Sequence, residues 1–128
     1  MNETVETVRE LAWEVRRELE TRVPLTRGQR RRNEAGHVSL KGLCGLASDR
    51  VWRRLGKNSA VHFGYFLTTR RARGAVIPHA AGHAWVVWQD AHRRPWIVDV
   101  TATQFGAFPR VLIARPFYRY IAGEPVTT

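Results

Sequence analysis

Apolar residues near the start of the chain recur every three or four positions, with charged residues between them. Within residues 4–22 glutamate and arginine occupy the opposite face, and the apolar set consists of Val5, Val8, Ala12, Val15 and Leu19. This period is typical of a helix that packs by one stripe, and Pro24 is expected to stop it. We therefore predict an N-terminal amphipathic helix within residues 1–23.

A second helical pattern covers residues 43–55, where the apolar positions lie four residues apart: Leu43, Ala47, Val51 and Leu55. Gly56 is a suitable stop for this helix. Residues 25–42 have glycines, a run of arginines and no sustained period, which indicates a loop with at most one helical turn. Cys44, the only cysteine of the chain, falls in the first turn of the second helix. Free N–H groups and the helix dipole favour a thiolate there.

The sequence after the second helix has the pattern of strands. Four segments are rich in valine, isoleucine and aromatic residues: residues 60–69, 84–89, 95–101 and 110–118. The segment DAHRRP is short enough for a hairpin, whereas we expect RRARGAVIPHAAG, between the first two strands, to be a longer loop. Helices followed by strands favour an α+β fold with an antiparallel β-sheet packed against the helix that carries Cys44. A length of 128 residues fits a single domain over residues 1–128.

Composition narrows the environment and the partners. Lysine and arginine outnumber aspartate and glutamate by 21 to 11, for a formal net charge of +10. This charge is typical of proteins with an acidic or nucleic-acid partner, and equally of proteins with an arginine-rich solvated surface. A single cysteine forms neither an internal disulfide nor a thiolate cluster, which indicates a reducing compartment. Without a signal-peptide pattern or a long apolar run, we expect a cytoplasmic protein with no membrane partner, unless a signal-independent route exports it.

Two residues stand out as partners for a reactive cysteine, which requires a base and an acceptor that orients the base. His83 follows a glycine at the start of a predicted strand and shares a strand face with Trp85. Asp99 interrupts an apolar strand, where a buried carboxylate is costly unless it is paired. In the predicted hairpin the two residues are about equally far from the turn. We therefore expect His83 and Asp99 to face each other across the strands.

The segments LCGLAS, GHAWV and WIVDVTATQF together resemble a known family. A cysteine at the head of a helix, a histidine that opens a strand and an aspartate in the next strand are similar to the core of the transglutaminase-like branch of the papain-like superfamily, in particular its small bacterial and phage-type members. The resemblance covers residues 38–106 as the catalytic core. It implies Cys44 as nucleophile, His83 as general base and acid, and Asp99 as the residue that orients the imidazole, with acyl transfer through a thioester.

Other residues are candidates for binding. The backbone N–H of Cys44 is the expected first oxyanion donor, and Gln29, Asn33 or Gln104 are candidate second donors or substrate contacts. The alternative for Gln104 is a hydrogen bond within the loop after the strand. We expect Trp85 in the core or beside the site. The other histidines, at positions 37, 62, 79 and 92, have no spacing that brings three ligands together, so we expect no metal site and no cofactor.

These inferences favour a thiol-dependent enzyme that hydrolyses a peptide bond or a glutamine side-chain amide. One alternative is a transglutaminase-type acyltransferase that joins the acyl group to an amine, and another is a non-catalytic basic nucleic-acid-binding module. The favoured partner is a peptide or protein, acidic if the basic stretches GQRRRN and TTRRARG lie near the cleft. Nucleic acid is less favoured, because the aromatic residues lie mainly in strands and the arginines in loops.

Overall fold

Helices come first along the chain and strands follow in the computed structural model, which describes residues 4–123. The helices are α1 (Val5–Thr21), α2 (Arg27–Arg30) and α3 (Cys44–Leu55), with two short 3-10 helices, η1 (Gly56–Asn58) and η2 (Ala102–Phe105). The strands are β1 (Ser59–Ala72), β2 (Ala75–Gln89), β3 (Pro95–Asp99), β4 (Leu112–Ala114) and β5 (Tyr120–Ala122), in an antiparallel sheet of order β4-β3-β2-β1-β5. The predicted α+β class is confirmed. None of the helices within residues 4–123 combines the length and the apolar composition that a membrane span requires.

The first helix, α1, forms where the apolar period predicts it. Thr4 caps its N-terminus through a hydrogen bond from the first turn, and the helix ends before Pro24. Its apolar stripe is 0% exposed at Val8, Ala12, Val15 and Leu19. Glu18 forms ion pairs with Arg50 and Arg54 of α3. The buried stripe and these ion pairs dock α1 against α3.

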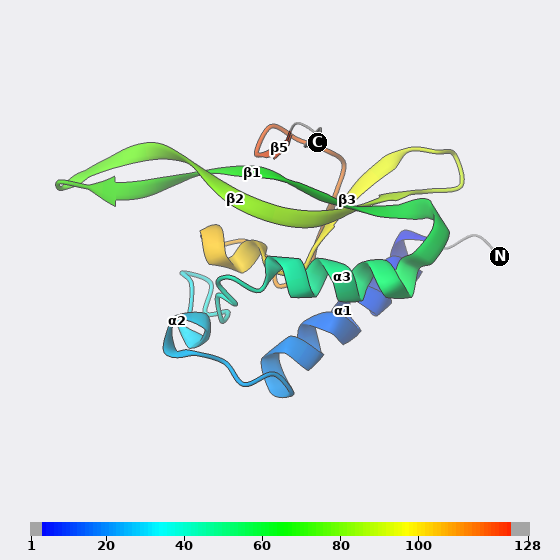
Figure 1. The fold of residues 1–128 in the computed structure, drawn as a ribbon, viewed down its shortest axis with the longest axis horizontal. Helices are drawn as coiled ribbons and strands as arrows, with labels where there is room; N and C mark the ends of the chain where they lie inside the picture. The colour runs from blue at the N-terminus through cyan, green and yellow to red at the C-terminus, as the bar shows by residue number, and fades with distance from the viewer. Residues whose placement is uncertain (1–3, 124–128) are drawn as a thin grey trace, which may run out of the picture.

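The second long helix, α3, lies between α1 and the sheet (Figure 1). It begins at Cys44, and Gly56 follows its last residue with a φ of 72°, which is the stop that the sequence predicts. The face at four-residue spacing is buried at Ala47, Val51 and Leu55. This face packs with α1 and with the sheet residues Val86, Trp88 and Val98. The antiparallel sheet is therefore packed against the helix that carries Cys44.

The segment RRARGAVIPHAAG is part of a long hairpin, so the prediction of a loop is wrong. β1 and β2 pair from Ser59 and Trp88 to Ala72 and Ala75, and their outer end extends past the helices (Figure 1). The turn consists of Arg73 and Gly74, with φ angles of 50° and 80°, the geometry of a two-residue hairpin turn. Proline has no backbone N–H to donate and is tolerated at a free strand edge. Pro78 lies at such an edge, because β3 pairs with β2 only at residues 86–89 within the described chain. We refer to residues 67–80 as the arm.

The C-terminal part of the sheet also differs from the prediction. The sequence predicts one strand over residues 110–118, but β4 and β5 are short strands on opposite edges of the sheet. Pro116 lies between them and interrupts the strand pattern. β5 approaches β1 so closely that a Cβ atom at Gly64 would overlap the carbonyl oxygen of Ile121. The predicted third strand is shorter than expected, because β3 ends at Asp99 rather than at residue 101.

Candidate active site

Cys44 is the first residue of α3 and is half-buried. A turn with two left-handed residues leads to it, since the fully buried Leu40 has a φ of 54° and Gly42 has a φ of 83°. The N-cap residue, Leu43, has no polar side-chain atom that could satisfy the N–H groups of the first helical turn. These groups are therefore suited to stabilise negative charge on the thiol or on an oxygen beside it.

His83 and Asp99 meet across the hairpin of β2 and β3. His83 Nε2 and Asp99 Oδ2 are 2.7 Å apart, and the two residues are only 4% and 3% exposed. They share a strand face, as expected, but they are not directly opposite. Pairing ends with Val86 across from Val98, and the same register places Asp99 across from Trp85, diagonal to His83. The shift arises because Gln89 pairs with Pro95, which moves the centre of the hairpin relative to the expected one.

Both carboxylate oxygens of Asp99 accept hydrogen bonds. Oδ1 accepts from the backbone N–H and the hydroxyl of Thr101 at 2.9 and 3.3 Å. Oδ2 accepts from the hydroxyl of Tyr120 at 2.7 Å, in addition to its contact with His83. Burial raises the pKa of Asp99, but the charge of His83 and these hydrogen bonds outweigh it and lower the pKa. Asp99 is thereby held as a carboxylate.

The pairing with Asp99 occupies Nε2 of His83 and leaves Nδ1 for Cys44. Nδ1 is buried and completes no hydrogen bond within the described residues, and Cys44 and His83 shift each other's pKa. His83 is the main cause that lowers the pKa of the Cys44 thiol; burial opposes it, and the backbone N–H of Ala84 adds to it. Burial lowers the pKa of His83, but Asp99 and then Cys44 raise it to about 9. Both shifts favour a thiolate beside an imidazolium.

Aromatic side chains surround the His83 ring. Trp85 is 3% exposed and stacks on it at 5.9 Å between centroids, and Phe105 of η2 meets it edge-on at 4.8 Å. The ring of Phe66 lies 6.0 Å away, also edge-on. Trp85 is thus both in the core and beside the site, the two positions that the sequence suggests. These apolar walls strengthen the electrostatic interaction between His83 and Asp99 by lowering the local dielectric constant.

The three candidate side-chain donors form hydrogen bonds elsewhere. Gln29 completes a capping box at the start of α2. Asn33 ties its own loop to the carbonyl of residue 106 at 2.7 Å. Gln104 donates to the carbonyl oxygen of Thr101 at 3.1 Å, which is the alternative considered for it. Because none of these contacts involves Cys44, the N–H groups of α3 are the oxyanion donors best supported by the geometry.

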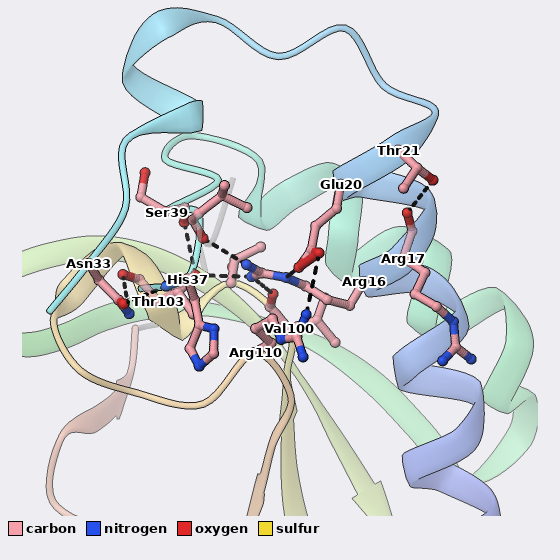
Figure 2. A network of polar contacts seen from close by, with 12 residues as sticks. Arg16, Arg17, Glu20, Thr21, Asn33, His37, Ser39, Val100, Thr103 and Arg110 are labelled. Atoms are coloured by element: carbon pink, nitrogen blue, oxygen red, sulfur yellow. Dashed lines mark hydrogen bonds and ion pairs between the residues drawn. The ribbon is translucent and has the colours of Figure 1, made fainter. Parts of the chain in front are cut away.

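A buried arginine of α1, which the sequence patterns do not single out, contacts Val100 and Thr103 (Figure 2). Arg16 of α1 is 0% exposed and donates to the carbonyl oxygens of Val38 at 2.7 Å and Val100 at 2.8 Å. Val38 belongs to the loop that leads to Cys44, and Val100 directly follows Asp99. The N-terminal helix therefore contributes a side chain that fixes both segments relative to each other.

Two surface hollows adjoin the segments on either side of Cys44. The arm-side hollow has a volume of about 420 Å³, and its lining includes Lys41, Gly42, Thr68, His79, Gly82 and Gln104. The helix-side hollow has a volume of about 490 Å³, and its lining includes Gly45, Asp49, Trp52, Ala60, Val61 and Phe63. Gly42 and Gly45 lie on the two sides of Cys44 in the chain. Each hollow is therefore lined by a residue within two positions of Cys44 in the chain.

The other histidines have different surroundings. His62 packs on Trp85 at 6.4 Å between ring centroids, and His92 lies in the turn between β2 and β3. His79, which the sequence places in a loop, is a residue of β2 because the hairpin is longer than predicted. Among residues 4–123, no three histidine, cysteine or acidic side chains gather to form a metal-binding group.

Similarity to known proteins gives no indication of what this protein does. Comparisons of the chain with protein-family models, with curated proteins and with solved structures give no match.

Proposed function

We propose that the protein is a thiol-dependent acyl-transfer enzyme with Cys44, His83 and Asp99 as its catalytic triad. The observation that carries this proposal is the arrangement around His83, whose Nε2 is paired with Asp99 at 2.7 Å while Nδ1 remains for Cys44. Nucleophilic catalysis requires a nucleophile, a base and a group that orients the base. The packing of α3 against an antiparallel sheet is compatible with the resemblance to a transglutaminase-like, papain-like core.

The first half of the proposed reaction forms a thioester. The Cys44 thiolate attacks the carbonyl carbon of an amide, and the N–H groups at the start of α3 stabilise the resulting oxyanion. His83 then donates the proton on Nδ1 to the nitrogen, the C–N bond breaks, and an amine or ammonia leaves. Asp99 keeps the ring aligned and stabilises its charged form throughout.

The second half resolves the thioester. His83 takes a proton from water, the oxygen attacks the thioester carbonyl, and the C–S bond breaks to release a carboxylic acid and the thiolate. The substrate is a peptide bond or the side-chain amide of glutamine. An amine in place of water would give a new amide, which is the transglutaminase-type alternative.

Alkylation and turnover together test this function. Iodoacetamide should label Cys44 at pH 6.5 about tenfold faster than it labels a free cysteine, and His83→Asn should abolish the difference while His92→Asn, in an exposed turn, should not. Glutamine-containing peptides should release ammonia or new termini, detected by mass spectrometry, and Cys44→Ala should remove that activity.

Two results would contradict the proposed function. One is alkylation of Cys44 at the rate of an ordinary thiol, combined with peptide turnover that Cys44→Ala leaves unchanged. The other is salt-dependent nucleic-acid binding without any amide turnover, which would favour the non-catalytic basic binding module.

A further inference from the structure

The arm carries positive charge that no acidic residue of β1 or β2 offsets. The sequence contains no acidic residue between Asp49 and Asp90, whereas Arg70, Arg71 and Arg73 lie within this interval, in the arm. All three arginines are exposed, and the arm extends beyond the helices (Figure 1). The arm is therefore a positively charged projection that an anionic group meets before it reaches the body of the protein.

One face of the arm leads directly to the site. Alternate residues of a strand share a face, so Arg70, Thr68 and Phe66 follow one another, and His79 lies across from Thr68. Phe66 belongs to the aromatic group around His83. The arm-side hollow lies along this face, with Thr68 and His79 among its lining residues. A chain bound along this face would pass from Arg70 to the catalytic histidine.

The two hollows differ in their charge. The arm-side hollow has Lys41 at its rim, three residues before Cys44, and none of its lining residues is acidic. The helix-side hollow contains Asp49 and the apolar side chains of Trp52 and Phe63. Asp49 is paired with Arg53 at 2.8 Å, so the described residues of this hollow present no free positive charge, whereas Lys41 of the arm-side hollow attracts an acidic side chain. The charges thus favour the arm-side hollow for an acidic side chain.

We propose that the arm-side hollow binds acidic side chains of a peptide substrate, within a few residues of the amide that Cys44 attacks. This inference rests on the proposed function and adds a substrate class to it. Lys41 lines the hollow, and Arg70 lies on the same strand face as its lining residue Thr68; these two side chains, Lys41 and Arg70, supply the positive charge. Within residues 4–123, the edge of β2 opposite β1 has no strand partner over residues 75–85. An extended peptide can pair with such an edge through its backbone.

An acidic peptide fits this surface better than a single-stranded nucleic acid does. Bases bind largely by stacking on aromatic side chains, and residues 67–80 contain no phenylalanine, tyrosine or tryptophan. The aromatic residues near the site surround His83, and Trp85 among them is buried. Residues 67–80 therefore offer charge and a free strand edge without an aromatic side chain, and Phe105 is the aromatic residue among those that line the arm-side hollow.

Chloroacetamide peptides test the inference, because Cys44 displaces chloride from them and is trapped as a thioether. Each probe carries the chloroacetamide in the middle of a glycine-serine peptide. Two glutamates are placed either on the N-terminal side or on the C-terminal side of the chloroacetamide. For each of these two placements, a matched probe carries glutamines in place of the glutamates. In at least one placement the glutamate probe should react about tenfold faster than its glutamine match. Lys41→Gln and Arg70→Gln should each reduce this ratio about threefold. Lys57→Gln, a matched control at the other end of α3, should leave it unchanged.

Iodoacetamide separates failure of this inference from failure of the proposed function. If iodoacetamide labels Cys44 rapidly but the glutamate-to-glutamine ratio is about one in both placements, the inference is overturned and the function stands. If iodoacetamide reacts at the rate of a free thiol, the function fails and the inference falls with it. A third outcome is a glutamate-to-glutamine ratio of about one together with tight binding of an oligothymidine, where Arg70→Gln weakens that binding. This outcome would assign the arm to nucleic acid instead.

Discussion

The hydroxyl of Tyr120 donates a hydrogen bond to Oδ2 of Asp99 at 2.7 Å, the same oxygen that holds the ring of His83. Tyr120 is in β5, at the edge of the sheet beside β1, and is brought to Asp99 only by the fold. Burial is the main cause that raises the pKa of Tyr120, so the hydroxyl remains a donor. It is therefore a positioning residue for the carboxylate.

Tyr120→Phe removes this donor and leaves the ring. Asp99 then holds the ring of His83 less firmly, and we expect alkylation of Cys44 at pH 6.5 to slow about tenfold, because a hydrogen bond to a charged group contributes about 1.5 kcal/mol. Tyr118→Phe is the matched control, since Tyr118 is 70% exposed and should leave the rate unchanged. Equal rates for Tyr120→Phe and the wild type would show that Asp99 does not depend on this donor.

Gly64→Ala should displace β5 and with it Tyr120. A Cβ atom at Gly64 would overlap backbone atoms of β5, and because the obstacle is backbone, the strand must move. We expect a loss of stability on the order of 2 kcal/mol and an alkylation rate similar to that of Tyr120→Phe. Gly82→Ala is the control for stability, since a Cβ atom there meets nothing within 4 Å. Urea denaturation measures both variants, and equal stability of the two would contradict the close approach.

Sequence patterns predict the helices well and the strand boundaries less well. The spacing of Val8, Val15 and Leu19 gives α1 because a helical stripe is a local property. The sequence predicts a loop in place of the arm because glycine and proline are typical of loops, whereas Gly74 makes a two-residue turn and Pro78 lies at an edge without a strand partner in the described chain. Turn type and edge position depend on pairing that a linear pattern does not contain.

The candidate triad follows from local signals, whereas the residues that support it do not. Asp99 is conspicuous as an acid in an apolar strand, and strand alternation places it on the face of His83. Tyr120 gives no signal, because a tyrosine in a short strand has many possible neighbours. Arg16 did carry one signal: it lies four residues after Ala12 and next to Val15, on the border of the buried stripe of α1. A charged residue at such a position requires partners.

The raised pKa of His83 predicts that its contribution to stability is lost at high pH. Its pKa is about 9 in the folded protein and about 6.5 in an unfolded chain. A group whose pKa is raised on folding stabilises the protein fully below the unfolded value, and this contribution disappears as the pH rises through 9. The expected loss between pH 6.5 and 9.5 is on the order of 3 kcal/mol.

The measurement is best made in a Cys44→Ala background, because the lowered pKa of the thiol contributes with the opposite sign. The urea midpoint of Cys44→Ala should fall between pH 6.5 and 9.5, by less than in the intact site because Cys44 also raises the pKa of His83, and adding His83→Gln should flatten this part of the profile. A decline of the same size in both proteins would assign the pH dependence to other groups.

Arg16→Lys tests whether the N-terminal helix positions the site. Arg16 donates to Val38 and Val100 from different guanidinium nitrogens, and a lysine ammonium is a single point that does not reproduce the planar fork. We expect a loss of stability of about 3 kcal/mol. A purely structural role of Arg16 would change stability alone. The second measurement is therefore the pH profile of Cys44 alkylation well below the melting temperature. If Arg16 positions Cys44 relative to His83, the profile of the folded variant shifts toward that of a free thiol. Arg17→Lys, on the exposed face of α1, should change neither quantity, and an unshifted profile in Arg16→Lys would restrict Arg16 to a structural role.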